Sequence, residues 1–274
     1  MKNLLIYISP KKEFDEETKV TVKIQIDNSL DLGWKKEDIM FFANFPYEYR
    51  GIRATFVSDD NFTPFFPPAT KINVIVELFK KGVFKEKELY WFHDFDVFQN
   101  YWFSQQEMEL ELEDADIGLC DKGRMPRWAT GSVFFKFSAG DIFSMIKLVS
   151  DKYQLNEEPA LNAITSNNLL WATHPRPEDI IGNQFVAANI PGSENINQRV
   201  KKINIRYNFA GWNIRSCYKM AGGVFKVVHF HPLDNDLSYG GMKALDFFMY
   251  GKNKINTFLV PERLIKIFNE HGIS

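Results

Sequence analysis

Short apolar segments alternate with a helix-like segment over the first hundred residues of this chain, and that alternation restricts the fold more than any other feature. The apolar segments predict strands at residues 4–8, 38–43, 53–57 and 89–92. A helix is predicted over residues 69–81, because one face carries Ile72, Ile75, Val76 and Phe79. Strands that alternate with helices are typical of a mostly parallel sheet with helices on its faces, so the predicted fold class is α/β.

The segment between Asp15 and Gly33 supports two interpretations. Apolar residues alternate with polar ones, as in a strand, at Val20, Val22, Ile24 and Ile26. The acidic start at residues 15–17, the length of the segment and the glycine at its end are typical of a helix. We interpret the segment as a helix.

The second half of the chain continues the α/β pattern without a repeat or a linker. Strands are predicted at residues 117–119, 133–137, 203–209 and 224–230. Helices are predicted over residues 141–153, after Asn156, and over residues 261–270. We therefore expect a single domain over residues 1–274, with a mixed α/β second half.

Composition excludes several classes of protein. With 274 residues of which 45% are hydrophobic, the chain can build a sizeable core without disulfides. The net charge of −2 gives no overall basic field toward nucleic acid, although Arg199, Lys201, Lys202 and Arg206 form one local basic cluster. No apolar run is long enough to span a membrane, and Cys120 and Cys217 lack metal-ligand spacing. We expect a cytoplasmic protein that does not insert into membranes.

Two acidic side chains follow the most apolar predicted strand. Residues 89–92 run directly into His93-Asp94-Phe95-Asp96. In parallel sheets, ligands bind at the carboxyl ends of the strands, which is where Asp94 and Asp96 would lie. Two carboxylates at this spacing can bind a hard divalent cation, although Asp-x-Asp by itself is also common in solvated turns.

Two histidines lie in and just after another apolar segment, Val227-Val228-His229-Phe230-His231. Neutral imidazole binds Mn²⁺ together with carboxylates, so either His229 or His231 is a candidate third ligand. Alternation along a strand sends both side chains to the same face, which leaves the choice open. A structural histidine bonded to backbone is the alternative.

The Asp-x-Asp segment, with the strand and helix before it, resembles the metal-binding segment of GT-A glycosyltransferases, which have a Rossmann-like fold. The resemblance implies that Asp94 and Asp96 bind Mn²⁺ or Mg²⁺ and, with Phe95 between them, contact the donor diphosphate and ribose. His229 is similar to the C-terminal metal-binding histidine of several such families, and we favour it over His231 on that analogy.

Three further segments carry the resemblance. Trp128 to Phe135 looks like the acceptor-side strand, with a glycine-centred turn at Thr130-Gly131 where the sugar approaches the backbone. Glu157-Glu158 resembles the acidic helix start that supplies the catalytic base in inverting members; both residues remain candidates, and interaction with the helix dipole is the alternative. Donor contacts are implied, in the order of the chain, for Ser9, Pro10, Lys11, Lys71 and Lys243, the last at a longer spacing than in the family.

The resemblance implies a metal-dependent glycosyltransferase that moves a sugar from a nucleotide-sugar, expected to be a UDP-sugar, to an acceptor hydroxyl. Residues 1–110 would bind the donor, and residues 111–274 would form the acceptor half. The acceptor is a glycan or, if the chain is viral, a hydroxymethylated base in DNA, and the location is then the host cytoplasm. A general likeness to enzymes of viruses and marine microbes prompts that second option. The alternatives are a sugar-1-phosphate nucleotidyltransferase, although the sequence after residue 8 lacks the expected glycine-rich loop, and a non-catalytic carbohydrate-binding protein.

Overall fold

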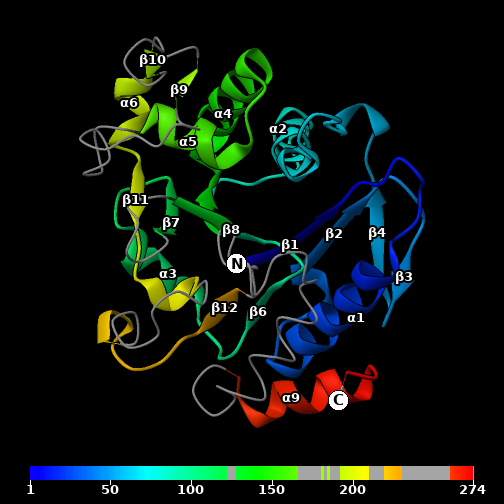
Figure 1. Cartoon of the computed structure of the whole chain (residues 1–274). Helices are drawn as coiled ribbons and strands as arrows, with labels where there is room; N and C mark the ends of the chain where they lie inside the picture. The colour runs from blue at the N-terminus through cyan, green and yellow to red at the C-terminus, as the bar shows by residue number, and fades with distance from the viewer. Residues whose placement is uncertain are drawn as a thin grey trace.

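A computed structural model describes residues 1–121, 128–165, 180–181, 184–185, 192–209, 219–229 and 260–273, and the statements below concern these residues. Its centre is a single eight-stranded sheet (Figure 1). In spatial order the strands are β11 (Val200–Lys202), β7 (Ile117–Asp121), β8 (Trp128–Lys136), β5 (Leu89–His93), β1 (Lys2–Tyr7), β2 (Ile39–Ala43), β4 (Ile52–Phe56) and β3 (Glu48–Tyr49). The stretch from β5 through β1 and β2 to β4 is parallel, and β8 is antiparallel to both β5 and β7.

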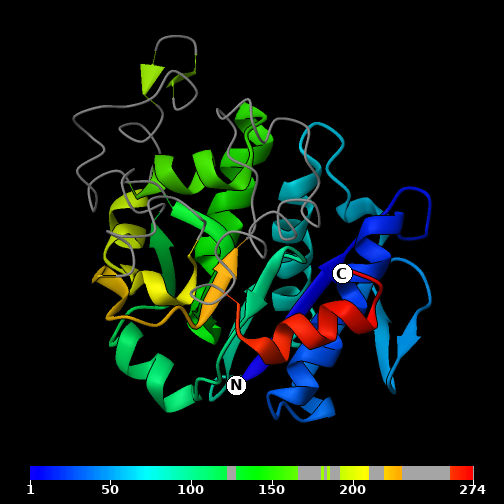
Figure 2. The same ribbon diagram turned by 60° about the horizontal axis from the view of Figure 1, so that its bottom comes forward.

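Helices cover both faces of the sheet (Figure 1). One face packs against α2 (Thr70–Lys80), α4 (Gly140–Tyr153) and α5 (Glu157–Ile164), and the short α6 (Ser193–Asn197) lies beside α5. The other face packs against α1 (Glu16–Asp31) and α3 (Gln105–Leu112). Helix α9 (Glu262–Glu270) runs along α1, as Figure 2 shows. Alternation in β1 explains the two cores, because Leu4 and Ile6 face one side and Leu5 the other.

Two small sheets stand apart from the large one. The first pairs β6 (Val97–Gln99) with β12 (Val227–His229) in antiparallel register. The second pairs β9 (Ile180–Ile181) with β10 (Gln184–Phe185). Strand β6 follows β5 directly in the chain, so the β6–β12 pair lies next to the carboxyl end of a central strand.

Helix α1 is the segment with two interpretations, and the helical one is confirmed. Asp15 caps its first turn by accepting a hydrogen bond of 2.7 Å from the Thr18 N–H. Its buried face is partly polar, because Thr21, Gln25, Asn28 and Ser29 are all buried beside Val22 and Ile26. This polar row removes the apolar stripe by which a helix is normally recognised.

The structure confirms the α/β class and most predicted elements, with two corrections. The predicted strand at residues 203–209 is wrong: residues 205–207 form a 3₁₀ helix, started by the Asn204 side chain, which accepts a hydrogen bond of 3.0 Å from the Arg206 N–H. Strand β8 begins at Trp128, before the predicted residue 133. Helix α3 was not predicted, because it buries only Met108 and Leu112.

None of the helices within the described part of the chain combines the length and apolarity that a membrane span requires.

Glu107 in α3 ties this helix to the segments around β12. Its carboxylate accepts hydrogen bonds from the Tyr207 hydroxyl and the Lys226 ammonium. Burial by itself raises the pKa of Glu107, but the bonds from Lys226 and Tyr207 outweigh burial, so the pKa lies below its ordinary value. A lowered pKa means that this carboxylate stabilises the folded state above the unfolded pKa of about 4.3, and that this contribution is lost on acidification.

We therefore predict that Glu107→Gln lowers the free energy of unfolding by about 1 kcal/mol at pH 7. The difference from the wild type should shrink as the pH falls below about 4, where the wild-type carboxylate is protonated. Urea unfolding of both proteins at pH 7 and at a pH below about 4 measures this difference in the free energy of unfolding. Glu109→Gln, an exposed position on the same helix, is the control, and an equal pH dependence in both variants would contradict the assignment.

Candidate metal and donor site

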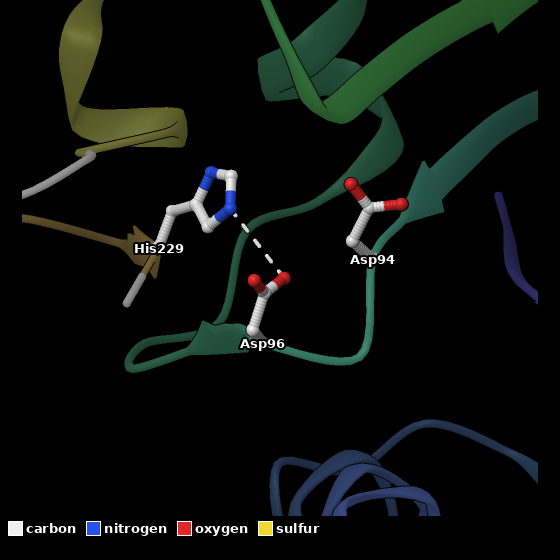
Figure 3. A group of neighbouring side chains, drawn as sticks. All are labelled: Asp94, Asp96 and His229. Carbon is white, nitrogen blue, oxygen red and sulfur yellow. Dashed lines mark ion pairs between the residues drawn. The ribbon is translucent and has the colours of Figure 1, made fainter. Parts of the chain in front are cut away.

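Asp94 and Asp96 lie in the turn that links β5 to β6 (Figure 3). The Asp94 N–H donates to the Gly131 carbonyl over 2.9 Å, and the Val97 N–H donates to the Asp94 carbonyl over 3.2 Å. The first bond fixes the turn to β8, and the second closes it tightly. Both carboxylates are therefore presented at the end of the central strand, as predicted.

His229 reaches this turn from the last position of β12. Strand pairing places His229 opposite Val97, and its N–H donates to the Phe209 carbonyl over 2.7 Å. Figure 3 shows its ring directed toward Asp96, with Nε2 3.4 Å from Oδ1. Ligand atoms of Asp94, Asp96 and His229 all lie within 4.8 Å of one another. Two carboxylates and one imidazole form a donor set that suits Mn²⁺ or Mg²⁺.

Gly131 provides the space that the imidazole occupies. A Cβ atom at this position would lie 2.4 Å from Cε1 and 2.6 Å from Nδ1 of His229. The residue lies within β8, so the predicted glycine-centred turn is wrong. The glycine accommodates a protein side chain that lies against its backbone, which sequence reasoning could not identify because the two residues are far apart in the chain.

Lys71, at the start of α2, is buried beneath the turn. Its ammonium nitrogen lies 2.9 Å from both carboxylate oxygens of Asp94 and 3.0 Å from Oε1 of Glu157. Burial alone lowers the pKa of Lys71, but the two carboxylates outweigh burial and the pKa is raised, so the side chain remains charged. Burial raises the pKa of Asp94, as do Asp96 and Glu157, against the opposing effect of Lys71.

His93, the last residue of β5, is buried next to Asp94 and was not among the predicted site residues. Its Nε2 lies 2.9 Å from Oδ1 of Asn3 in β1. Burial lowers the pKa of His93 to about 4, so the ring is neutral near pH 7. This ring fills the space below the turn without adding charge.

The two predicted catalytic glutamates occupy different environments. Glu157 is 3% exposed, pairs with Lys71 and accepts a hydrogen bond of 3.0 Å from the Thr130 hydroxyl. Glu158 is half-buried, and its Oε1 accepts a bond of 3.3 Å from the Thr130 N–H. Thr130, the residue before Gly131, therefore contacts both glutamates.

Asp94 and Lys71 line an open cleft. Ser9 and Pro10 line it too, so four of the predicted donor residues share one cleft. Lys11 is exposed on the same loop but does not line the cleft. Phe95 and Asp96 instead line a neighbouring cleft on the α1 side. His231 and Lys243, two further predicted site residues, lie outside the described part of the chain.

Asn44 fixes the loop that forms the wall with Ser9, and the sequence analysis missed it. Its Oδ1 accepts from the Ser9 N–H over 3.0 Å, and its Nδ2 donates to the Ser9 carbonyl over 2.8 Å. The same Nδ2 donates to Asp59 over 2.8 Å. A buried amide that directly follows an apolar strand was the available signal.

No protein-family model matches the sequence, and no curated protein sequence matches it. Solved structures of similar fold do exist. The galactosyltransferase LgtC, in complex with donor and acceptor sugar analogues, has a TM-score of 0.52 and 14% sequence identity over 97% of this chain and 100% of that one. An active-site variant of LgtC has a TM-score of 0.52 and 13% sequence identity, over 97% of this chain and 100% of that one. The bifunctional glycosyltransferase WbbM has a TM-score of 0.51 and 9% sequence identity, over 98% of this chain and 51% of that one. These likenesses confirm the predicted GT-A fold.

The contact between Gly131 and His229 yields a prediction. Gly131→Ala should lower the free energy of unfolding by about 1–3 kcal/mol, because the added methyl overlaps the imidazole. It should also weaken Mn²⁺ binding, measured by isothermal titration calorimetry, because the ring must move.

A double variant tests the cause. Gly131→Ala combined with His229→Ala should be about as stable as His229→Ala alone, because the overlapping ring is gone. If the two substitutions destabilise additively, the imidazole is not what requires the glycine.

Proposed function

We propose that this protein is a metal-dependent glycosyltransferase that moves a sugar from a nucleotide-sugar to an acceptor hydroxyl. We propose further that residues 1–274 act as one domain, in which residues 1–110 bind the donor and residues 111–274 shape the acceptor side. A cytoplasmic location, in the host cytoplasm if the source is a virus, belongs to the same proposal.

One observation carries the proposal: Asp94, Asp96 and His229 converge at the carboxyl end of a central strand, beside an open cleft, in a chain with the GT-A fold. Open α/β sheets bind ligands at this edge. LgtC, which has a similar fold, binds donor and acceptor sugar analogues. A nucleotide-sugar, with UDP as the expected nucleotide, is the corresponding donor here.

The chain's own residues suit the departure of a nucleoside diphosphate. Mn²⁺ or Mg²⁺ held by the two aspartates and His229 would supply positive charge to the leaving diphosphate. Lys71, which also lines the cleft, offsets part of the negative charge of Asp94 and Glu157 and so keeps the edge of the cleft less repulsive to a diphosphate. The loop at Ser9 and Pro10 lines the same cleft and would contact the nucleoside.

Of the two glutamates, we assign Glu158 as the carboxylate that acts on the reacting groups. Glu157 is buried, and its Oε1 serves Lys71 and Thr130. Glu158 is half-buried and lies at the start of α5, next to the same threonine. A general base needs access to the substrate as well as a carboxylate, and Glu158 is the more exposed of the two.

The basic cluster considered for DNA gives that acceptor little support, because three of its four residues are paired within the protein. Arg199 pairs with Asp116 and Asp141, Lys201 pairs with Glu113, and Lys202 pairs with Asp121. Cationic side chains that already pair with carboxylates attract DNA phosphates only weakly. A hydroxymethylated base in DNA is therefore the second choice, and the nucleotidyltransferase and the non-catalytic sugar-binding protein are the alternatives to any transferase.

The first test is a thermal-shift screen of nucleoside diphosphates and nucleotide-sugars with and without Mn²⁺. We expect one nucleotide to raise Tm only when Mn²⁺ is present, because a metal held by Asp94, Asp96 and His229 would attract the diphosphate. Asp96→Ala should abolish this shift and sugar transfer while retaining the folded circular-dichroism spectrum. Transfer at near wild-type rates in that variant would sink the proposal, and nucleotidyl transfer in place of sugar transfer would favour the first alternative.

The roles of the glutamates separate in a paired experiment. Glu158→Gln should lower kcat by about 100-fold or more, with Tm and nucleotide affinity retained, because only the proton acceptor is lost. Glu157→Gln should lower Tm, because Lys71 loses one of its two counter-ions. The reverse pattern, with Tm affected by Glu158→Gln alone, would exchange the two assignments.

A further inference from the structure

Gln25 is a buried polar residue in the middle of α1, and its side chain reaches the turn that carries the aspartates. It is 1% exposed. Its Nε2 donates to the Phe95 carbonyl over 3.0 Å and to the Val97 carbonyl over 2.6 Å. Both hydrogens of one amide group are thus used on carbonyls immediately before and after Asp96.

We propose that Gln25 is a positioning residue for Asp96, an inference that rests on the metal site proposed above. The carbonyls of Phe95 and Val97 are both drawn toward α1 by a single amide, which fixes the backbone on either side of Asp96. With the backbone fixed, the Asp96 carboxylate is directed to His229, whose Nε2 is 3.4 Å away. Residues that orient a metal ligand in this way set the affinity of the site.

The geometry of β6 explains why a helix side chain is needed. Among the described residues, β6 has only β12 as a strand partner, so its other edge presents carbonyls without a ladder. Buried carbonyls require a donor. Helix α1 supplies donors from its polar row, with Gln25 at the turn and Asn28 one turn further on.

Val22 and Ile26, on either side of Gln25 in the chain, are buried in the apolar core, whereas the amide of Gln25 faces two backbone carbonyls. Replacing the amide would leave two buried carbonyls to find water or to rotate. Either response moves the segment that contains Asp96 and leaves Asp94, which is held separately by Gly131 and Lys71.

Asn28 provides a matched control. It is also 1% exposed and in α1, and its Nδ2 donates to the Gln99 carbonyl over 3.0 Å. Its Oδ1 further accepts from Arg263 of α9 over 2.8 Å. Asn28 thus makes the same kind of bond to the same strand, three residues beyond Asp96.

The experiment measures Mn²⁺ binding to the full chain without nucleotide, by water-proton relaxation enhancement, for the wild type, Gln25→Met and Asn28→Leu. We expect Gln25→Met to raise the Kd for Mn²⁺ by about tenfold. Asn28→Leu should change this Kd by less than about twofold while lowering Tm at least as much, because it breaks a bond remote from the ligands. If Gln25→Met does not fold, Gln25→Leu tests the same loss of both donors without adding a charge near the metal ligands.

The outcomes are distinct. An unchanged Mn²⁺ affinity in the Gln25 variant, or an equal loss in both variants, overturns the positioning role and leaves the metal site standing. Absence of Mn²⁺ binding to the wild type overturns the metal site itself, and the inference with it. A selective loss in the Gln25 variant supports both.

Discussion

A single buried ammonium group, that of Lys71, connects three elements that are distant in the sequence. It joins the start of α2 to the end of β5 through Asp94 and to the start of α5 through Glu157. Buried charges are costly unless they are paired, so removal of any partner leaves the others uncompensated. Asp94 and Glu157 flank the ammonium and Asp96 lies near Asp94, so the site carries an excess of negative charge that a divalent cation would balance. The ion pairs of Lys71 thus hold α2 and α5 together and set the charge at the carboxyl end of β5.

Much of the fold could be predicted because its signals are local. The apolar run that forms β5 and the polar residues after it fixed both the strand and the place of Asp94 and Asp96. The face of α2 that carries Ile72 and Ile75 had the helical period. The helix α1 was harder, since Gln25 and Asn28 occupy positions where apolar residues normally reveal the buried face. Its capping residue Asp15 was the stronger signal.

The parts that could not be predicted depend on contacts between distant segments. Lys71 was identified as a cation near the donor, yet nothing in its surroundings indicates Glu157 as a partner. The fit of His229 against Gly131 requires knowledge of where β12 lies relative to β8. Asn204 starts a 3₁₀ turn through its own side chain, and this overrides an alternation of apolar residues that otherwise predicts a strand.

The separate sheet of β6 and β12 has a consequence for how the protein is made. The main sheet is built from β11 and the strands before it, whereas β6 pairs, among the described residues, only with β12, which is synthesised later. During synthesis β6 therefore has an unpaired strand edge, and such edges tend to pair with other chains. Helix α1, already synthesised, can cover that edge with its amides in the interval. The polar row of α1 would then bind the carbonyls of β6 in the nascent chain before β12 is synthesised.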